Sequence, residues 1–131
     1  MWWLTRVRSH SMRPTLTDGQ LVLTRSLQPT YAVGRGDVVV LDSPVEPGLD
    51  VVKRVVGLPG ETVTFDAGKV HINGLPLSEA YASPSMFRGE YHVPAGHYLV
   101  LGDNRDVSSD SRTWVRPYVP RAALRGRLVR R

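Results

Sequence analysis

A serine near the N-terminus and a lysine inside an apolar segment are the residues best suited to chemistry. Ser11 lies in residues 9–16 (SHSMRPTL), and Lys53 lies in residues 51–61 (VVKRVVGLPGE). A serine hydroxyl becomes a nucleophile when a base takes its proton, and a neutral lysine amine can be that base. Pro14 stiffens the backbone just after Ser11. Ser9 can donate to a developing oxyanion together with the Ser11 backbone N–H.

The neighbours of Lys53 predict a β-strand. Four valines flank the Lys53-Arg54 pair, and Pro59-Gly60 is typical of a type II turn. Strand side chains alternate, so Lys53 shares a face with Val51 and Val55. Burial on an apolar face lowers the pKa of a lysine and makes the amine available as a base. The segment by itself also allows the more common case, a lysine whose stem covers apolar surface while its amine stays in water.

A third polar segment covers residues 102–112 (GDNRDVSSDSR). Arginine–carboxylate pairs of this kind lock loops through bidentate hydrogen bonds. A calcium loop is the alternative, but the spacing differs from the EF-hand pattern, and the arginines compete with a cation. No metal and no cofactor is expected. The histidines show no metal-ligand spacing and are interpreted as surface or interface residues: His10, His71, His92 and His97.

The elements that must position these segments are predominantly strands. Alternating or wholly apolar runs predict the strands 20–26, 36–41, 51–56, 61–65, 69–72, 91–93 and 97–102. Turn residues predict a hairpin through 66–68 and a second strand pair joined through 94–96. Residues 73–91 carry little pattern and predict an irregular excursion. The tail, 119–129, allows either a short helix at 120–124 or a last strand.

Composition limits the class of protein. The 131 residues fit one all-β domain over 1–131, and the absence of cysteine excludes disulfides and thiolate metal sites. A net charge of +5 indicates an anionic neighbour, either nucleic acid or a lipid surface. No apolar run approaches the roughly 20 residues of a transmembrane helix. Residues 1–4 (MWWL) suit a membrane interface or a first core strand. Basic residues gather towards both ends: Arg6, Arg8, Arg13, Arg121, Arg125, Arg127, Arg130 and Arg131.

Taken together and in this order, the three segments closely resemble the type I signal peptidases, the serine–lysine peptidases of family S26. The resemblance runs from about residue 9 to residue 119 and includes 69–74 (KVHING). It implies that Ser11 is the nucleophile and Lys53 the general base. Ser9 and the Ser11 N–H correspond to the oxyanion donors.

The resemblance assigns further residues around this dyad. Ser108 corresponds to the serine that orients the lysine amine, and Asp110 and Arg112 correspond to a supporting ion pair. The positions that match the walls of the substrate pocket are Val7, Met12, Leu16 and Val52.

The family resemblance also implies fold, activity and location. The implied fold is a pair of packed antiparallel sheets, related to the β-clip, with a reduced second subdomain. The implied activity is removal of signal peptides from exported preproteins by cleavage after small residues. The enzyme is then expected at a membrane surface, with its site on the extracytoplasmic face. The membrane-spanning segment that the family has before the serine is missing from this sequence, a departure that predicts a truncated, soluble or surface-bound form.

Two further departures and two rival functions remain. Residues 113–120 (TWVRPYVP) lack the glycine that the family usually has there and are about two residues longer. The excursion after residue 72 is short. One rival function is a dedicated maturation protease for a single partner. The other is a basic, non-catalytic nucleic-acid module, which rests on charge alone.

Overall fold

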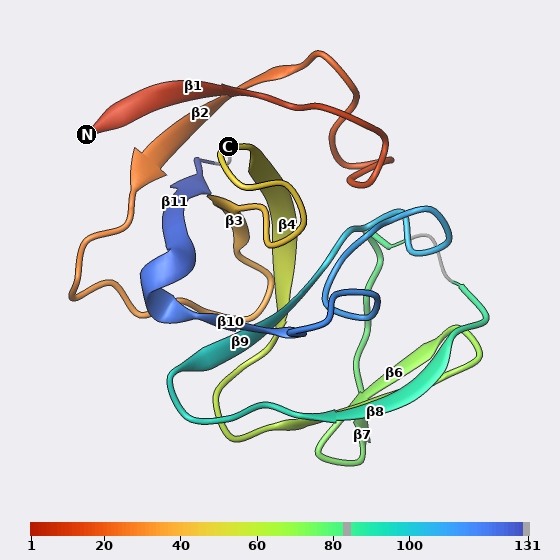
Figure 1. Ribbon diagram of the computed structural model, residues 1–131. Coiled ribbons are helices and arrows are strands. Elements are labelled where there is room, and N and C mark those ends of the chain that lie inside the picture. The colour runs from red at the N-terminus through yellow and green to blue at the C-terminus, as the bar shows by residue number, and fades with distance from the viewer. Residues whose placement is uncertain (83–84, 130–131) are drawn as a thin grey trace.

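Antiparallel strands form two sheets in the computed structural model, which describes residues 1–82 and 85–129 (Figure 1). The larger sheet has the order β1-β2-β11-β3-β4-β9-β10 and the smaller one β7-β6-β5-β8. The predicted all-β, antiparallel class is confirmed. The strands of the larger sheet are β1 (Trp2–Arg6), β2 (Leu21–Ser26), β3 (Val38–Asp42), β4 (Asp50–Gly57), β9 (His97–Leu101), β10 (Tyr118–Pro120) and β11 (Leu124–Leu128). Those of the smaller sheet are β5 (Thr62–Asp66), β6 (Lys69–Ile72), β7 (Leu75–Pro76) and β8 (Arg88–His92).

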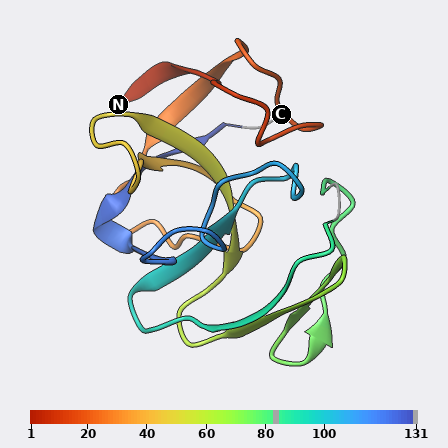
Figure 2. The ribbon, with the colours of Figure 1, turned by 45° about the vertical axis from the view of Figure 1, so that its right-hand side comes forward.

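Strand β4 connects the centre of the larger sheet to the smaller sheet. It pairs with β3 on one side and β9 on the other, and the chain then turns at 58–61 into β5. Both ribbon views show the smaller sheet below the larger one (Figures 1 and 2). A buried cluster joins the two sheets, because Val56 and Leu99 of the larger sheet pack with Val63 and Phe65 of the smaller.

One predicted strand pair is wrong. Residues 91–93 and 97–102 were expected to pair with each other through the turn at 94–96. Instead β8 pairs with β5, and β9 pairs with β4 and β10. The turn therefore carries the chain from one sheet to the other. The N–H of Val93 donates to Glu61 O and the N–H of Gly60 to Val93 O, each over 2.8 Å, so the two crossing segments run side by side.

Both ends of the chain form regular elements. The tail forms both elements, a 3-10 helix η1 (Arg121–Ala123) and then β11. Residues 2–6 form a strand, yet Trp2 and Leu4 are 52% and 60% exposed.

The excursion is more regular than predicted, because it contains β7 and the start of β8. Residues 83–84 of the excursion, as well as Arg130 and Arg131, lie outside the described residues. No helix in the described ranges is long and apolar enough to cross a membrane.

Gly57 sits where β4 leaves the larger sheet, and the packing there admits no side chain. A Cβ atom at this position would lie 2.9 Å from Leu99 Cβ, 2.9 Å from Val63 Cγ2 and 3.0 Å from Val93 Cγ2. Carbon atoms do not approach so closely without a shift of the surrounding backbone. The junction between the sheets therefore depends on this glycine.

We expect Gly57→Ala to lower the free energy of unfolding by roughly 1–3 kcal/mol, since overpacking forces neighbouring atoms apart. Urea denaturation followed by circular dichroism measures the change. Gly34→Ala is the matched control, because the nearest atom to a Cβ there is Asp37 Oδ2 at 4.0 Å. Equal stability of the two variants contradicts the close packing at the junction.

Candidate active site

The loop that carries Ser11 connects β1 to β2 and is held from two sides. Its backbone accepts two hydrogen bonds from Asn104, whose N–H binds Ser11 O over 2.9 Å and whose side-chain amide binds His10 O over 3.1 Å. Met12, 1% exposed, anchors the loop in the core beneath. Ser9 has a φ of 82° and donates its N–H to Asp18 Oδ1 over 2.7 Å. The Ser11 backbone is therefore fixed between the core and the segment after β9.

Lys53 lies in the middle of β4 and is only 4% exposed. Val39 of β3 lies opposite it in the sheet. The Nζ atom of Lys53 donates a hydrogen bond to Ser108 Oγ over 3.3 Å. Burial lowers the pKa of Lys53 to about 8; the Asp110 carboxylate opposes the shift, and the Arg112 charge adds to it. The amine is thus partly neutral near pH 8, and the solvated alternative for this lysine is wrong.

Ser9, Ser11 and Lys53 line one pocket, whose apolar walls are Val45, Val51, Val107 and Trp114. The Ser11 N–H donates to Ser9 Oγ over 3.5 Å, so the two groups expected to bind an oxyanion are adjacent. Among the hydrogen bonds of the described chain, that of the Lys53 amine runs to Ser108 and not to Ser11. The roles of Ser9, Ser11, Lys53 and Ser108 stay predictions that this arrangement allows.

Gly102 is the point at which the Ser11 loop and the Ser108 segment meet. A Cβ atom on Gly102 would lie 2.1 Å from Ser108 Oγ and 2.5 Å from Ser11 O. Only a glycine at position 102 therefore lets the Ser11 loop and the Ser108 segment come this close to each other. The sequence analysis did not single out this residue, although a glycine directly after a buried strand was a signal for it.

Asp110 and Arg112 contact each other beneath the site. Arg112 donates to both carboxylate oxygens of Asp110, from Nε and Nη2 over 2.8 Å each, and the N–H of Gly102 adds a bond of 3.0 Å. Burial alone would raise the pKa of Asp110, but the hydrogen bonds and charge of Arg112 hold it below its ordinary value. Asp110 therefore stays ionised beside Lys53. Its supporting role stays a prediction.

The four residues matched to the substrate pocket lie together in the core rather than on the pocket walls. They share one buried cluster with Val38, Val40 and Leu128 and are 1–8% exposed: Val7, Met12, Leu16 and Val52. Their assignment to substrate contacts stays a prediction. The side chains that do form the apolar walls of the pocket were not among the four predicted residues. Which side chains face the pocket depends on how β4 packs against residues 107–114, and the sequence does not show this packing.

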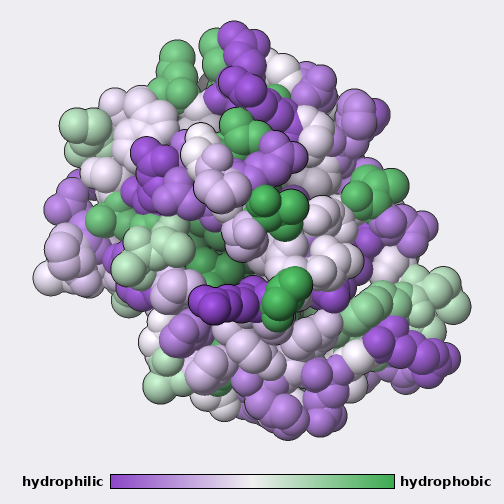
Figure 3. Space-filling model, viewed as in Figure 1, coloured by the Kyte–Doolittle hydropathy of each residue, from purple (hydrophilic) through white to green (hydrophobic). Residues whose placement is uncertain are grey.

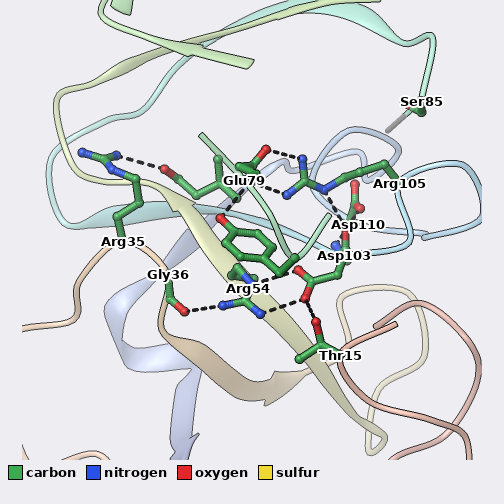
Figure 4. A network of polar contacts seen from close by, with 12 residues as sticks. Thr15, Arg35, Gly36, Arg54, Glu79, Ser85, Asp103, Arg105 and Asp110 are labelled. Atoms are coloured by element: carbon green, nitrogen blue, oxygen red, sulfur yellow. Dashed lines mark hydrogen bonds and ion pairs between the residues drawn. The ribbon is translucent and has the colours of Figure 1, made fainter. Parts of the chain in front are cut away.

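A second buried charge network involves Asp103, whose segment was expected to form arginine–carboxylate pairs, but its partner Arg54 was not predicted (Figure 4). Arg54, next to Lys53 but on the opposite face of β4, donates from Nε and Nη2 to Asp103, each over 2.8 Å. Thr15 donates its hydroxyl to the same carboxylate over 2.5 Å. The available signal was an arginine in a valine-rich strand. Because the valines on the face of Arg54 predict that this face is buried, an arginine there needs a buried carboxylate partner. The network ties β4 to the Ser11 loop.

No group of three or more His, Asp or Glu side chains in residues 1–82 and 85–129 is arranged to hold a metal ion. The polar side chains that line the candidate pocket are Ser9, His10, Ser11, Ser43, Glu46, Lys53 and Ser109.

Comparisons with known proteins identify the family of the chain. The family model "Signal peptidase, peptidase S26" matches residues 1–131. The chain is 43% identical to a signal peptidase I of Leptolyngbya laminosa, over 94% of this chain and 64% of that protein. It is 34% identical to a signal peptidase I of Pseudomonas fluorescens, over 91% of this chain and 57% of that protein. The chain thus spans 57–64% of the length of these two relatives.

A solved structure shows the same fold. A signal peptidase I from Enterococcus faecalis V583 superposes with a TM-score of 0.65 at 33% sequence identity, over 76% of this chain and 98% of that one. The expected signal-peptidase-like fold is confirmed by this match. With the family model covering every residue, the chain belongs to the signal peptidase family, peptidase S26.

Proposed function

We propose that this chain is a serine endopeptidase that uses a Ser11–Lys53 dyad to remove signal peptides from exported preproteins. The observation that carries the proposal is a buried lysine of lowered pKa that lines the same pocket as Ser11. A lysine is an effective base when its pKa is near the working pH. Family membership supports the substrate class.

The chemistry follows from these groups. The neutral Lys53 amine takes the Ser11 hydroxyl proton as the oxygen attacks the scissile carbonyl. The Ser11 N–H and the Ser9 hydroxyl stabilise the resulting oxyanion. The C–N bond then breaks, and the Lys53 ammonium returns the proton to the leaving amine. Water, deprotonated by Lys53, hydrolyses the ester and regenerates Ser11.

A groove beside the pocket supports binding of an extended substrate. Residues of β1 and the following loop form one wall, and the 43–51 segment before and within β4 forms the other. Ser9, Glu46 and Val51 line both the groove and the pocket, so the two are continuous. The valines at the pocket suit a small apolar side chain before the scissile bond.

The outer face of β1 and β2 supports association with a membrane surface. Trp2, Leu4, Leu21 and Leu23 are 43–60% exposed, and the register places Leu4 opposite Leu23. Arg25 lies opposite Trp2 and its guanidinium is 5.1 Å from the ring centroid. Apolar side chains are visible along the upper edge of Figure 3, over these strands. Apolar, aromatic and basic groups on one face suit the interface of an anionic lipid layer, on the extracytoplasmic side for this substrate class.

We expect Ser11→Ala and Lys53→Met each to lower preprotein cleavage at least about 10³-fold, because residues that act as a unit fail as a unit. Lys53→Arg should abolish cleavage as well, since a guanidinium does not give up its proton and cannot act as the base. The measurement is incubation with several unrelated detergent-solubilised preproteins, followed by mass analysis of the cut. Lys69→Met, which removes an exposed lysine of β6, is the control. Undiminished cleavage by Ser11→Ala sinks the proposal, and cleavage of a single preprotein favours a dedicated maturation protease.

The rate of cleavage should rise with pH through a midpoint near 8. The free enzyme is active when Lys53 is neutral, and the pKa of Lys53 is about 8. Between pH 6 and pH 9 the neutral fraction, and with it kcat/KM, therefore increases about a hundredfold. Initial rates on a peptide substrate across this range test the expectation. A midpoint above pH 10, or a flat profile, is incompatible with a buried lysine base.

Binding to vesicles of phosphatidylglycerol and phosphatidylcholine tests the membrane surface. The double variant Leu4→Asp, Leu23→Asp should bind at least about tenfold more weakly, since each buried leucine contributes roughly 1.5–3 kcal/mol. Leu75→Asp is the matched control, because Leu75 is 70% exposed on the smaller sheet. Equal loss of binding in both variants rules out a specific role for the β1–β2 face.

A further inference from the structure

Glu79, from the excursion after β7, makes a buried ion pair with the segment that follows β9. Its carboxylate accepts from both terminal nitrogens of Arg105, over 2.9 and 2.6 Å. The two side chains are 8% and 4% exposed, respectively. Removal of one partner from such a pair leaves an uncompensated charge, so the contact constrains both segments.

Arg105 connects Glu79 to the candidate site, because it also binds the backbone at Gly102. Its Nε donates to Gly102 O over 2.7 Å. Gly102 is the residue at which Ser11 O and Ser108 Oγ come so close that a Cβ is not accommodated. A displacement of Arg105 therefore moves the junction between the Ser11 loop and the hydroxyl that binds Lys53.

Tyr81 reaches the same site through Arg54. The Arg54 guanidinium carbon lies 3.7 Å from the centroid of the Tyr81 ring, a cation–π contact. The Tyr81 hydroxyl donates to Glu79 Oε2 over 2.9 Å. Burial, reinforced by the Glu79 carboxylate, raises the pKa of Tyr81, so that the hydroxyl keeps its proton.

Arg54 in turn fixes the Ser11 loop. It holds Asp103 with two hydrogen bonds, and Asp103 accepts the Thr15 hydroxyl. Figure 4 shows the Glu79–Arg105 pair and, beside it, Asp103 with its contacts to Arg54 and Thr15; the Tyr81 ring over Arg54 joins the two sets. Two routes thus lead from the excursion to the candidate site, one through Arg105 and Gly102 and one through Arg54 and Thr15.

We propose that Glu79 and Tyr81 are positioning residues for the Ser11–Lys53 site: they clamp the excursion onto Arg105 and Arg54 and thereby hold nucleophile and base in register. The inference rests on the proposed function. Neither residue lines the pocket or the groove next to it. Their effect therefore falls on turnover and not on substrate binding, because small misplacements of reacting groups cost large factors in rate.

The test measures kcat and KM separately for Glu79→Gln, Tyr81→Leu and Tyr81→Phe, on protein shown by circular dichroism to be folded at the assay temperature. Glu79→Gln and Tyr81→Leu should lower kcat at least about tenfold with KM changed less than about twofold. Tyr81→Phe keeps the ring over Arg54 and should retain kcat within about threefold of the unchanged chain.

Glu61→Gln is the matched control, since Glu61 also binds an arginine in bidentate fashion, with Arg35 at 2.6 and 2.9 Å. That pair holds the turn after β4. Glu61→Gln should therefore reduce the thermal midpoint without lowering kcat in the folded protein.

Several results overturn the inference. Unchanged kcat in Tyr81→Leu does so directly, and a rise in KM alone assigns the residues to substrate binding instead. Equal loss of kcat in Glu61→Gln reduces the effect to general stability. If neither Glu79→Gln nor Tyr81→Leu folds, the excursion is a folding element and not a positioning device. Absence of Ser11-dependent cleavage in the unchanged chain removes the proposed function, and this inference with it.

Discussion

Burial of the Lys53 amine is the constraint on which the site depends. A shift of the lysine pKa from 10.5 to about 8 means that the protonated form is destabilised by on the order of 3 kcal/mol. This cost falls on the folded protein below pH 8 and is relieved as the pH rises towards 10.5, where the unfolded chain also loses the proton. The fold keeps the amine in place because β3 and β9 enclose β4, and because Ser108 supplies a hydroxyl partner.

Two neighbouring residues of β4, Lys53 and Arg54, are buried with different kinds of partner. Arg54 and Lys53 are both almost fully buried, on opposite faces of the strand. Arg54 donates hydrogen bonds to the Asp103 carboxylate and to Gly36 O. Lys53 binds a neutral hydroxyl, so its amine can change protonation. An arginine–lysine exchange at either position is not conservative, since only the lysine can act as a base.

Local sequence patterns predicted individual elements better than their partners. The valine-rich runs became β3 and β4, because β-branched residues favour strands and because apolar side chains suit a central strand that is covered on both faces. The turn at 94–96 was recognised, but the strands on either side of it pair in different sheets. Turn residues determine a change of direction, whereas pairing depends on which apolar faces meet. Glu79 and Tyr81 carried no local pattern at all, because both act through contacts with Arg105 and Arg54.

The amino-acid sequence alone determined the all-β class, the order of the three polar segments and their resemblance to the signal peptidases. The all-β class followed from the alternating and apolar runs, and the resemblance followed from the residue types of the three segments and their order along the chain. Tertiary structure decided that Lys53 is buried, that Ser9, Ser11 and Lys53 line one pocket, and that Gly102 permits the approach of Ser11 to Ser108. These properties depend on the water and charge around each group, which are set by segments distant in sequence that packing brings together.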